Sequence, residues 1–282
     1  MSIGAVIFAQ NNSEIDYTKM AIYSAEQVIK HLSIPVTIIT DNVDYLNTQF
    51  PNHPFDMVIE IPFELSFQER KFYDGSLTVK KTSWRNQSRS MVYDLSPYDT
   101  TLVLDSDYII NSDTLKHALG RDYDFQIYRN SMDLSDWRSN YEFTRINQYS
   151  IPFYWATVFI FRKSLIMESF FTLVQYIKEN WVYFKVLYNI DSHVFRNDFA
   201  FSIAIHIMNG KTNGEFATEL PGTMIYIVDT DKLIAVSDNK MKFLLEKEDR
   251  IGEYIVAKTD GLDIHVMNKI SLTRCIDGVY DD

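Results

Sequence analysis

The segment Asp99-Thr-Thr-Leu-Val-Leu-Asp105-Ser106-Asp107-Tyr-Ile-Ile-Asn-Ser-Asp113 decides the expected fold. Its apolar run has β-branched members and polar flanks, a pattern typical of a strand buried on both faces. Two carboxylates follow, and strand alternation predicts that Asp105 and Asp107 point to the same side. Carboxylates at the end of a buried strand need a compensating charge, and Mg²⁺ or Mn²⁺ takes hard oxygen ligands of this kind. The segment therefore predicts a divalent-metal site, although Asp-x-Asp pairs also occur in turns and at helix N-caps.

Length and composition favour a chain with one sizeable core. The 282 residues are 46% hydrophobic, which is enough for one large domain. The formal net charge of −11 disfavours broad binding to nucleic acid or anionic membranes. The single cysteine, Cys275, excludes an intramolecular disulfide framework and a thiolate zinc cluster. No secretory signal is recognisable, and the aromatic-rich segment 151–161 is too short to span a bilayer. We therefore expect a soluble, cytoplasmic protein.

Apolar runs and helical spacing predict an alternation of strands and helices along the chain. Buried strands are expected at 3–9, 35–40 and 58–61, with a helix at 17–31 between the first two. A strand, a helix and a strand at this spacing indicate a parallel βαβ unit. We find no repeat or flexible linker, so the whole chain, 1–282, is expected to form one α/β domain. Further elements are predicted as strands at 125–128, 157–161, 224–228 and 262–266, and as helices at 78–95, 164–181 and 198–208.

Two common phosphate-binding motifs are absent from the sequence. No Gly-x-Gly-x-x-Gly follows the first expected strand, and the full P-loop pattern Gly-x-x-x-x-Gly-Lys-Ser/Thr does not occur, since Gly210-Lys211-Thr212 has Ile205 where the pattern needs its first glycine. Basic residues gather instead just before the acidic strand, at Lys80, Lys81, Arg85 and Arg89. If the protein binds phosphate, we expect a metal ion and basic side chains to bind it, although such a run also occurs on solvated helix faces.

At this point the sequence resembles a known family. The segment 96–107, Ser-Pro-Tyr-Asp-Thr-Thr-Leu-Val-Leu-Asp-Ser-Asp, together with His265-Val-Met-Asn-Lys269, resembles the GT-A glycosyltransferases. It is nearest in look to the retaining branch that includes glycogenin and the bacterial lipopolysaccharide galactosyltransferases. The resemblance implies a single Rossmann-like domain whose mixed, mostly parallel central sheet is flanked by helices. It also implies a nucleotide-binding half, residues 1–110, and an acceptor-binding half, residues 111–282.

The resemblance further implies roles for individual residues. Asp105, Asp107 and His265 would hold Mn²⁺, or Mg²⁺, on the diphosphate of a nucleotide-linked sugar, in the usual case a UDP-sugar. Lys269 would contact phosphate, and the family's basic residue before the metal motif corresponds best to Arg89. The other expected donor-binding residues are Ala9, Gln10, Asn11, Asp41, Lys81, Arg85 and Ser106. Asp41, an expected donor-binding residue, is also a candidate helix cap.

The chain departs from the family pattern in two places. Residues 154–158, Tyr-Trp-Ala-Thr-Val, stand where the family commonly has Phe-Asn-Ala-Gly-Val, so Trp155 is expected to stack on the sugar or the acceptor. Asp198 is followed by Phe where the family has Asp-Gln. We expect Asp198 to remain an active-site carboxylate, and its alternative role is the N-cap of a helix at 199–209. These departures leave the donor sugar and the stereochemical outcome open.

The expected activity is metal-dependent transfer of a hexosyl or pentosyl group from a nucleotide-diphosphate sugar to an acceptor hydroxyl, with retention. The alternatives are a sugar-nucleotide nucleotidyltransferase, a non-catalytic nucleotide-sugar-binding protein, and a transferase of the phage type that glycosylates a hydroxylated DNA base. The acceptor stays open among a glycan, a protein, a small molecule and a modified DNA base, as does the oligomeric state. A DNA acceptor would need a basic and aromatic groove, for which the available residues are Trp84, Arg85, Arg129, Trp137, Arg138 and Arg145.

Overall fold

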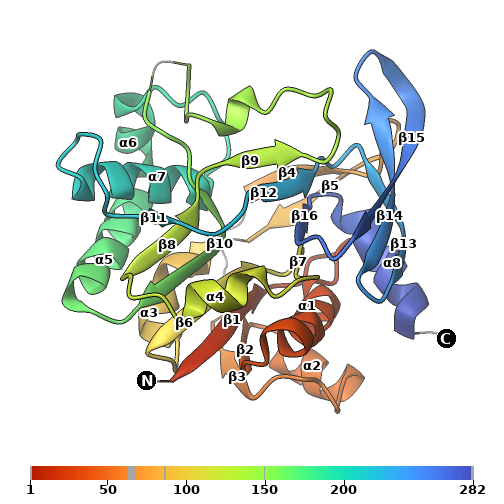
Figure 1. Cartoon of the computed structure of the whole chain (residues 1–282), viewed down its shortest axis with the longest axis horizontal. Coiled ribbons are helices and arrows are strands. Elements are labelled where there is room, and N and C mark those ends of the chain that lie inside the picture. The colour runs from red at the N-terminus through yellow and green to blue at the C-terminus, as the bar shows by residue number, and fades with distance from the viewer. Residues whose placement is uncertain (1, 63–67, 86, 149, 281–282) are drawn as a thin grey trace.

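The computed structural model describes residues 2–62, 68–85, 87–148 and 150–280, and its centre is a mixed β-sheet (Figure 1). Seven strands lie in the order β11-β8-β10-β6-β1-β2-β3. Strand β10 is antiparallel to both of its neighbours, and every other pair in this sheet is parallel. The predicted α/β fold with a mixed, mostly parallel central sheet flanked by helices is therefore confirmed. The strands are β1 (Ile3–Ala9), β2 (Val36–Thr40), β3 (Met57–Glu60), β6 (Thr100–Asp105), β8 (Phe125–Tyr128), β10 (Trp155–Arg162) and β11 (Thr218–Glu219).

Two groups of helices cover this sheet. Helices α4 and α8 each pack on α1, which lies against β1 and β2. Helices α3 and α7 each pack on α5, and α7 also lies against β10. Because helices cover the sheet, its central strands are continuous apolar runs, and β2 is buried along its whole length. Within the described ranges the helices are α1 (Tyr17–Leu32), α2 (Val43–Gln49), α3 (Val92–Leu95), α4 (Thr114–Leu119), α5 (Leu165–Glu179), α6 (Trp181–Leu187), α7 (Asn197–Met208) and α8 (Lys269–Tyr280), with the 3₁₀ turns η1 (Gln87–Met91) and η2 (Tyr141–Phe143).

Local chemistry sets the ends of the helices and the turn before β6. The Asp16 side chain accepts a hydrogen bond from the backbone N–H of Lys19 and so caps the N-terminus of α1. Tyr98, in the turn before β6, lies directly over Gly4 of β1, where a Cβ atom would come within 2.3 Å of its ring. The Tyr98 hydroxyl also pairs with the Thr37 hydroxyl of β2 at 2.9 Å. Glycine at position 4 is therefore required by the close approach of this ring.

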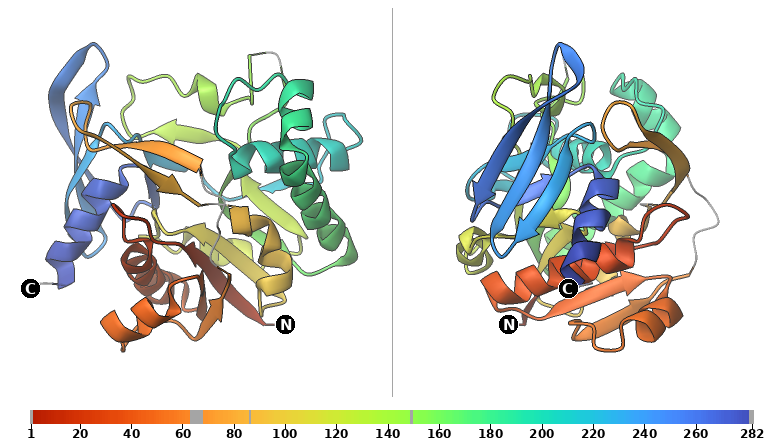
Figure 2. Two further views of the ribbon diagram at one scale, coloured as in Figure 1. Left: turned by 180° about the vertical axis from the view of Figure 1, so that it is seen from behind. Right: turned by 90° about the vertical axis from the view of Figure 1, so that its right-hand side faces the viewer.

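Three smaller sheets surround the central one. The first has the order β7-β16-β12-β9, and its β7–β16 pair sets His265 opposite Tyr108. The second is the antiparallel sheet β13-β14-β15, and the third is the hairpin β4–β5. Figure 2 shows this hairpin reaching toward the β13–β15 sheet. Their bounds are β4 (Gln68–Tyr73), β5 (Val79–Trp84), β7 (Tyr108–Ile109), β9 (Ser131–Asp133), β12 (Met224–Ile227), β13 (Lys232–Ser237), β14 (Lys240–Lys247), β15 (Arg250–Asp260) and β16 (Ile264–Val266).

One predicted element is wrong in type. The helix expected at 78–95 is a strand, β5, followed by η1 and the single helical turn α3, as far as this segment is described. Residues 79–84 pair in register with 68–73 across the hairpin. This partner has few apolar residues, so the sequence pattern did not reveal it as a strand. The Asp41 side chain does not cap α2, since the N-cap residue is Asn42.

Among the described residues, no helix combines the length and the apolar character that a membrane crossing requires.

Candidate active site

A cavity of about 290 Å³ opens where strands β1 and β6 end. Parallel strands place their carboxyl ends at one edge of a sheet, and ligands bind at such edges in open α/β folds. Both strands contribute to the wall here, and the hairpin β4–β5, the start of α7 and the strand β16 complete it. The lining residues are Phe8, Gln10, Tyr17, Arg70, Trp84, Arg85, Arg89, Asp105, Ser106, Asp107, Phe143, Ala156, Thr157, Val194, Arg196, Asn197, Asp198, His265, Met267 and Lys269.

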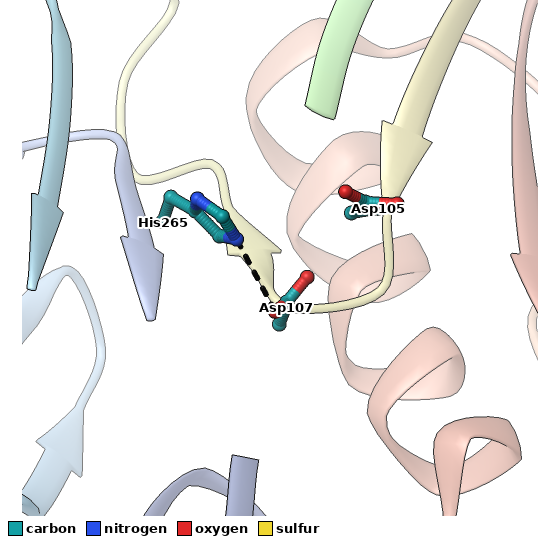
Figure 3. A group of neighbouring side chains, drawn as sticks. All are labelled: Asp105, Asp107 and His265. Atoms are coloured by element: carbon teal, nitrogen blue, oxygen red, sulfur yellow. Dashed lines mark hydrogen bonds and ion pairs between the residues drawn. The ribbon is translucent and has the colours of Figure 1, made fainter. Parts of the chain in front are cut away.

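Three potential metal ligands converge in this cavity. One ligand atom from each of Asp105, Asp107 and His265 lies within 4.8 Å of the other two (Figure 3). Asp105 is the last residue of β6, and Asp107 lies in the turn that leads into β7. Strand alternation predicted that the two carboxylates lie on one face of a strand, and this prediction is wrong. They converge instead because the chain turns after β6. The β7–β16 pairing then brings His265 beside them.

Asp107 is a buried carboxylate in contact with two basic groups. It is 2% exposed, and its Oδ2 lies 3.2 Å from Nε2 of His265 and accepts a hydrogen bond from Nζ of Lys269. Burial acts to raise the pKa of Asp107, but the charges of Lys269 and His265 outweigh it, so the pKa lies well below its ordinary value. Asp107 is therefore an anion at neutral pH.

Asp105 has a buried cation of its own. Arg89, from η1, ion-pairs with Asp105 and also donates to the backbone carbonyl of Ala156. Burial lowers the pKa of Arg89 to about 10, and burial also lowers the pKa of Lys269. In both residues the effect of burial exceeds the effect of the neighbouring carboxylates. Each carboxylate of the cluster is thus matched by a cation that burial destabilises.

The cluster fits a divalent cation. Two carboxylate oxygens suit Mn²⁺ or Mg²⁺, and an imidazole nitrogen adds a third ligand. A third of the Asp105 side chain is exposed to the cavity, which leaves access for further ligands. Nδ1 of His265 is buried and has no hydrogen-bond partner in the described part of the chain. Residues of this kind and arrangement can hold a metal ion against an anionic ligand.

Asp198 forms a second polar centre in the lining of the cavity. Its Oδ1 accepts from the backbone N–H of Ala156 at 2.9 Å, and its Oδ2 accepts from Nε and Nη2 of Arg196 at 3.0 and 2.8 Å. The N-cap residue of α7 is Arg196, and Asp198 lies within the first turn. The alternative role of Asp198 as an N-cap is therefore wrong.

The structure brings together most of the residues that the sequence analysis selected. Strand alternation explains one exception, because Phe8 of β1 and Gln10 just after this strand line the cavity and Ala9 between them does not. Asn11 turns its side-chain oxygen toward the backbone N–H of Thr18. The predicted residues that line the cavity are Gln10, Arg85, Arg89, Asp105, Ser106, Asp107, Asp198, His265 and Lys269, and those outside its lining are Ala9, Asn11, Asp41, Lys81 and Trp155.

Trp155 and Lys81 have other surroundings. Trp155 is fully buried among Phe143, Phe153 and Tyr226, so its indole presents no face to the cavity. Its ring lies edge-on to His265, with centroids 5.9 Å apart, and packs behind that side chain. Lys81 lies on the outer face of the hairpin and pairs with Glu69.

The residues proposed for a nucleic-acid groove do not gather in one place. Trp84 and Arg85 line the cavity. Arg138 instead lies in a separate ion-pair cluster with Asp133 and Asp231, and Arg145 donates to the Ser150 carbonyl.

Several lining residues had no role in the sequence analysis. Arg70 belongs to a strand of mostly charged residues, whose sequence does not show which face is buried. Arg196 has no sequence signal of its own apart from the nearby candidate Asp198. Tyr17 carried a usable signal, because it is an aromatic residue at the first helical position after the end of β1.

No protein-family model and no curated protein sequence matches this chain. Solved structures with similar folds include the glycosyltransferase GlyE of Streptococcus pneumoniae TIGR4, with 12% identity and a TM-score of 0.46 over 78% of this chain. They also include the galactosyltransferase LgtC in complex with donor and acceptor sugar analogues, with 15% identity and a TM-score of 0.44 over 78% of this chain. The matched region amounts to 46% of the GlyE chain and 73% of the LgtC chain, so this chain spans about half the length of GlyE. Both solved structures are named as glycosyltransferases.

Proposed function

We propose that this protein is a metal-dependent glycosyltransferase that moves a sugar from a nucleoside diphosphate to an acceptor hydroxyl. The observation that carries the proposal is the cluster of Asp105, Asp107 and His265, in which each carboxylate also contacts a buried cation at the edge of an α/β sheet. A site with ligands for one divalent metal ion and with buried cations beside them suits a ligand that carries both a metal ion and phosphate. A nucleotide-linked sugar with a divalent ion is such a ligand.

Asp105, Asp107 and His265 would hold Mn²⁺ or Mg²⁺. When bound, the ion supplies Lewis-acid stabilisation of charge on the diphosphate. Arg89 and Lys269, which lie beside the two carboxylates, would supply positive charge to the phosphate oxygens. Their hydrogen bonds strengthen as charge develops on the leaving group, so they stabilise the transition state more than the ground state.

The transfer itself breaks one bond and forms one. The bond between the anomeric carbon and the diphosphate oxygen breaks, and the oxygen keeps the electron pair. The acceptor oxygen bonds to the anomeric carbon and releases its proton to solvent. Asp198, held by Arg196 and by the Ala156 N–H, is positioned to accept hydrogen bonds from sugar hydroxyls. We further propose a UDP-linked donor, retention of configuration, nucleotide binding by residues 1–110 and acceptor binding by residues 111–282.

The decisive experiment is a donor and acceptor panel. Wild-type protein is incubated with labelled UDP-, GDP-, ADP- and CDP-sugars, with Mn²⁺ or with EDTA, and transfer to glycans, peptides and hydroxylated DNA is measured together with donor hydrolysis. We expect metal-dependent turnover with one nucleotide, and NMR of the product anomer reports retention or inversion. Asp107→Asn is expected to abolish turnover, whereas the matched surface variant Asp122→Asn, whose side chain is 94% exposed, retains it. Full metal-dependent turnover by Asp107→Asn would refute the proposal.

The same panel separates the alternatives. A nucleotidyltransferase would release pyrophosphate from a nucleoside triphosphate, and a binding protein would show metal-dependent thermal stabilisation by a nucleotide sugar without turnover.

A further inference from the structure

Arg70 is a cation at the cavity whose described contacts are aromatic rings alone. Its Cζ lies 4.8 Å from the ring centroid of Trp84 and 5.4 Å from that of Phe72. No hydrogen bond or ion pair joins its side chain to another described residue. Rings stacked on the plane of a guanidinium leave the N–H groups at its edges available to donate. Arg70 therefore presents unused donors to the cavity that it lines.

The other cavity cations already have protein partners. Arg89, Lys269 and Arg196 each pair with a carboxylate, and Arg85 donates to the Asn11 carbonyl. Among the described lining residues, five Arg and Lys side chains face three Asp side chains, so two positive charges are in formal excess. An excess of this kind favours an anion with more than one charge.

The hairpin that carries Arg70 is fixed at several points. At its base, the backbone N–H of Phe195 donates to Oε1 of Gln68 at 2.6 Å. Along β5, Nδ2 of Asn12 donates to the Ser83 carbonyl at 2.9 Å. At its tip, Arg274 of α8 donates to Asp74 at 2.9 Å. These bonds tie the hairpin to the loop after β1, to the start of α7 and to α8, so Arg70 is positioned before any ligand arrives.

Arg70 acts electrostatically on the site described above. Burial is the main cause that lowers the pKa of Lys269, and the charge of Arg70 lowers it further, against the opposing effects of Asp107 and of Asp229, whose carboxylate also attracts Arg70. The two cations therefore lie near enough to repel each other. An anion between them would remove this repulsion and satisfy the free N–H groups of Arg70.

We propose that Arg70 binds the diphosphate of the nucleotide donor, together with Lys269, and that Trp84 is the positioning residue that holds its guanidinium in place. The inference rests on the proposed function. It adds Arg70 of the β4–β5 hairpin as a phosphate-binding residue, and the sequence resemblance implies no role for Arg70.

The test compares a diphosphate with a monophosphate of the same nucleoside. Calorimetric titration in the presence of Mn²⁺ first selects the tightest binder among UDP, GDP, CDP and ADP, and its monophosphate is then titrated. Arg70→Gln is expected to raise the Kd of the diphosphate by about tenfold to a hundredfold, the usual size for loss of a charged hydrogen bond. The Kd of the monophosphate is expected to change less than about threefold. Lys71→Gln, the neighbour on the exposed face of the strand, is the matched control and leaves both constants unchanged.

Trp84 is tested with a pair of variants. Trp84→Phe keeps a ring under the guanidinium and should retain diphosphate binding, whereas Trp84→Leu should reproduce the loss seen in Arg70→Gln. The double variant Arg70→Gln/Trp84→Leu should be no weaker than either single variant, because both changes remove the same interaction. Circular dichroism and thermal unfolding establish that each variant is folded.

Two results would overturn the inference and leave the proposed function standing. In one, Arg70→Gln binds the diphosphate as tightly as the wild type. In the other, it loses the monophosphate and the diphosphate equally, which would place Arg70 on the nucleoside. If folded wild-type protein binds none of the diphosphates, the proposed function fails together with the inference.

Discussion

Two buried clusters of carboxylates and cations lie in this molecule, and they are built differently. In the first, Asp105 and Asp107 contact Arg89, Lys269 and His265 at the cavity. In the second, Arg138 donates to Asp133 at 2.8 and 3.0 Å and to Asp231 at 2.8 Å. Asp133 also accepts from the backbone N–H of Ser135, and Asp231 from that of Glu246. We refer to the second cluster, Asp133, Arg138 and Asp231, as the Arg138 triad.

The balance between burial and charge separates the two clusters. Burial acts to lower the pKa of Arg138, but its two carboxylates outweigh burial and the pKa rises. For Arg89 and Lys269 burial outweighs the carboxylates and the pKa falls. The cation of the triad is thus compensated by its two carboxylates, although burial raises the pKa of Asp231, whereas burial prevails at the two cations of the active-site cavity. A buried charge by itself does not indicate a functional site, whereas a buried cation that its carboxylates do not compensate, at the wall of a cavity, marks a candidate functional group.

Replacing a cation in each cluster should have opposite consequences. Lys269→Met is expected to lower kcat/KM for sugar transfer by about a thousandfold, because it removes a group that stabilises charge in the transition state. The change leaves Asp107 buried with His265 as its remaining basic neighbour, so some stability is lost as well, but less than in Arg138→Met, which leaves two carboxylates without their cation. Steady-state kinetics and thermal unfolding check the two parts. A large loss of stability with unchanged kinetics would show that Lys269 is structural, like Arg138.

Arg138→Met should break the triad. The change leaves Asp133 and Asp231 buried without their cation, so the free energy of unfolding is expected to fall by about 3 kcal/mol. Urea denaturation measures this loss, and kcat/KM per folded molecule should be unchanged. A loss of activity in folded Arg138→Met would place the triad in the site and remove the distinction between the clusters.

Asp263 sharpens the comparison because it is a buried carboxylate that accepts hydrogen bonds but has no described ion pair. It accepts from the backbone N–H groups of Asn111 and Ser112, yet burial dominates and raises its pKa to about 6. Since the folded pKa exceeds that of an unfolded Asp, the group stabilises the fold fully below pH ~4, and this stabilisation is lost as pH rises through 6. Between about pH 4.5 and about pH 7.5 the loss amounts to about 2 kcal/mol.

Asp263→Asn is expected to abolish that loss. Urea denaturation of the wild type and the variant at both pH values gives the difference directly, since all other groups titrate in both proteins. Identical pH dependence in the two proteins would show that the Asp263 carboxyl is not perturbed.

The smallest expected effect concerns metal binding without nucleotide. Arg89 occupies the Asp105 carboxylate, so Mn²⁺ alone has to compete with it. Arg89→Gln should therefore bind free Mn²⁺ about tenfold more tightly than the wild type, and nucleoside diphosphate should improve Mn²⁺ affinity less in the variant than in the wild type. Electron paramagnetic resonance of free Mn²⁺ measures both quantities. Equal affinity in variant and wild type would mean that Arg89 does not compete with the ion.

The sequence predicts the parts of this molecule whose signal is local. The strands β1, β2 and β6 are apolar runs covered by helices, so their residues reveal them. The β13–β15 sheet and the β4–β5 hairpin were not predicted, because they lack the continuous apolar runs of the central strands. In β14 the buried apolar residues alternate with charged ones, a half-buried strand pattern that the prediction did not use. Asp105 and Asp107 followed from their place after a buried strand.

The remaining site residues depend on contacts across long stretches of chain. His265 and Lys269 entered only through the family resemblance, because nothing in their own segment joins them to the acidic strand. Arg70 had no signal at all, since its position depends on a hairpin that is itself hard to detect. Trp155 was expected at the surface of the cavity, and only three-dimensional packing shows it enclosed by other rings.

The separation of Asp107 from Lys269, 162 positions along the chain, has a consequence during translation. At a synthesis rate of about 5–20 residues per second, Asp107 leaves the ribosome roughly ten to thirty seconds before Lys269 does. Throughout that interval the acidic turn lacks two of its basic neighbours, and strand β7 lacks its partner β16. A nascent chain therefore carries the two carboxylates before their basic neighbours His265 and Lys269 exist, and the proposed nucleotide site is complete only when residues 264–269 have docked.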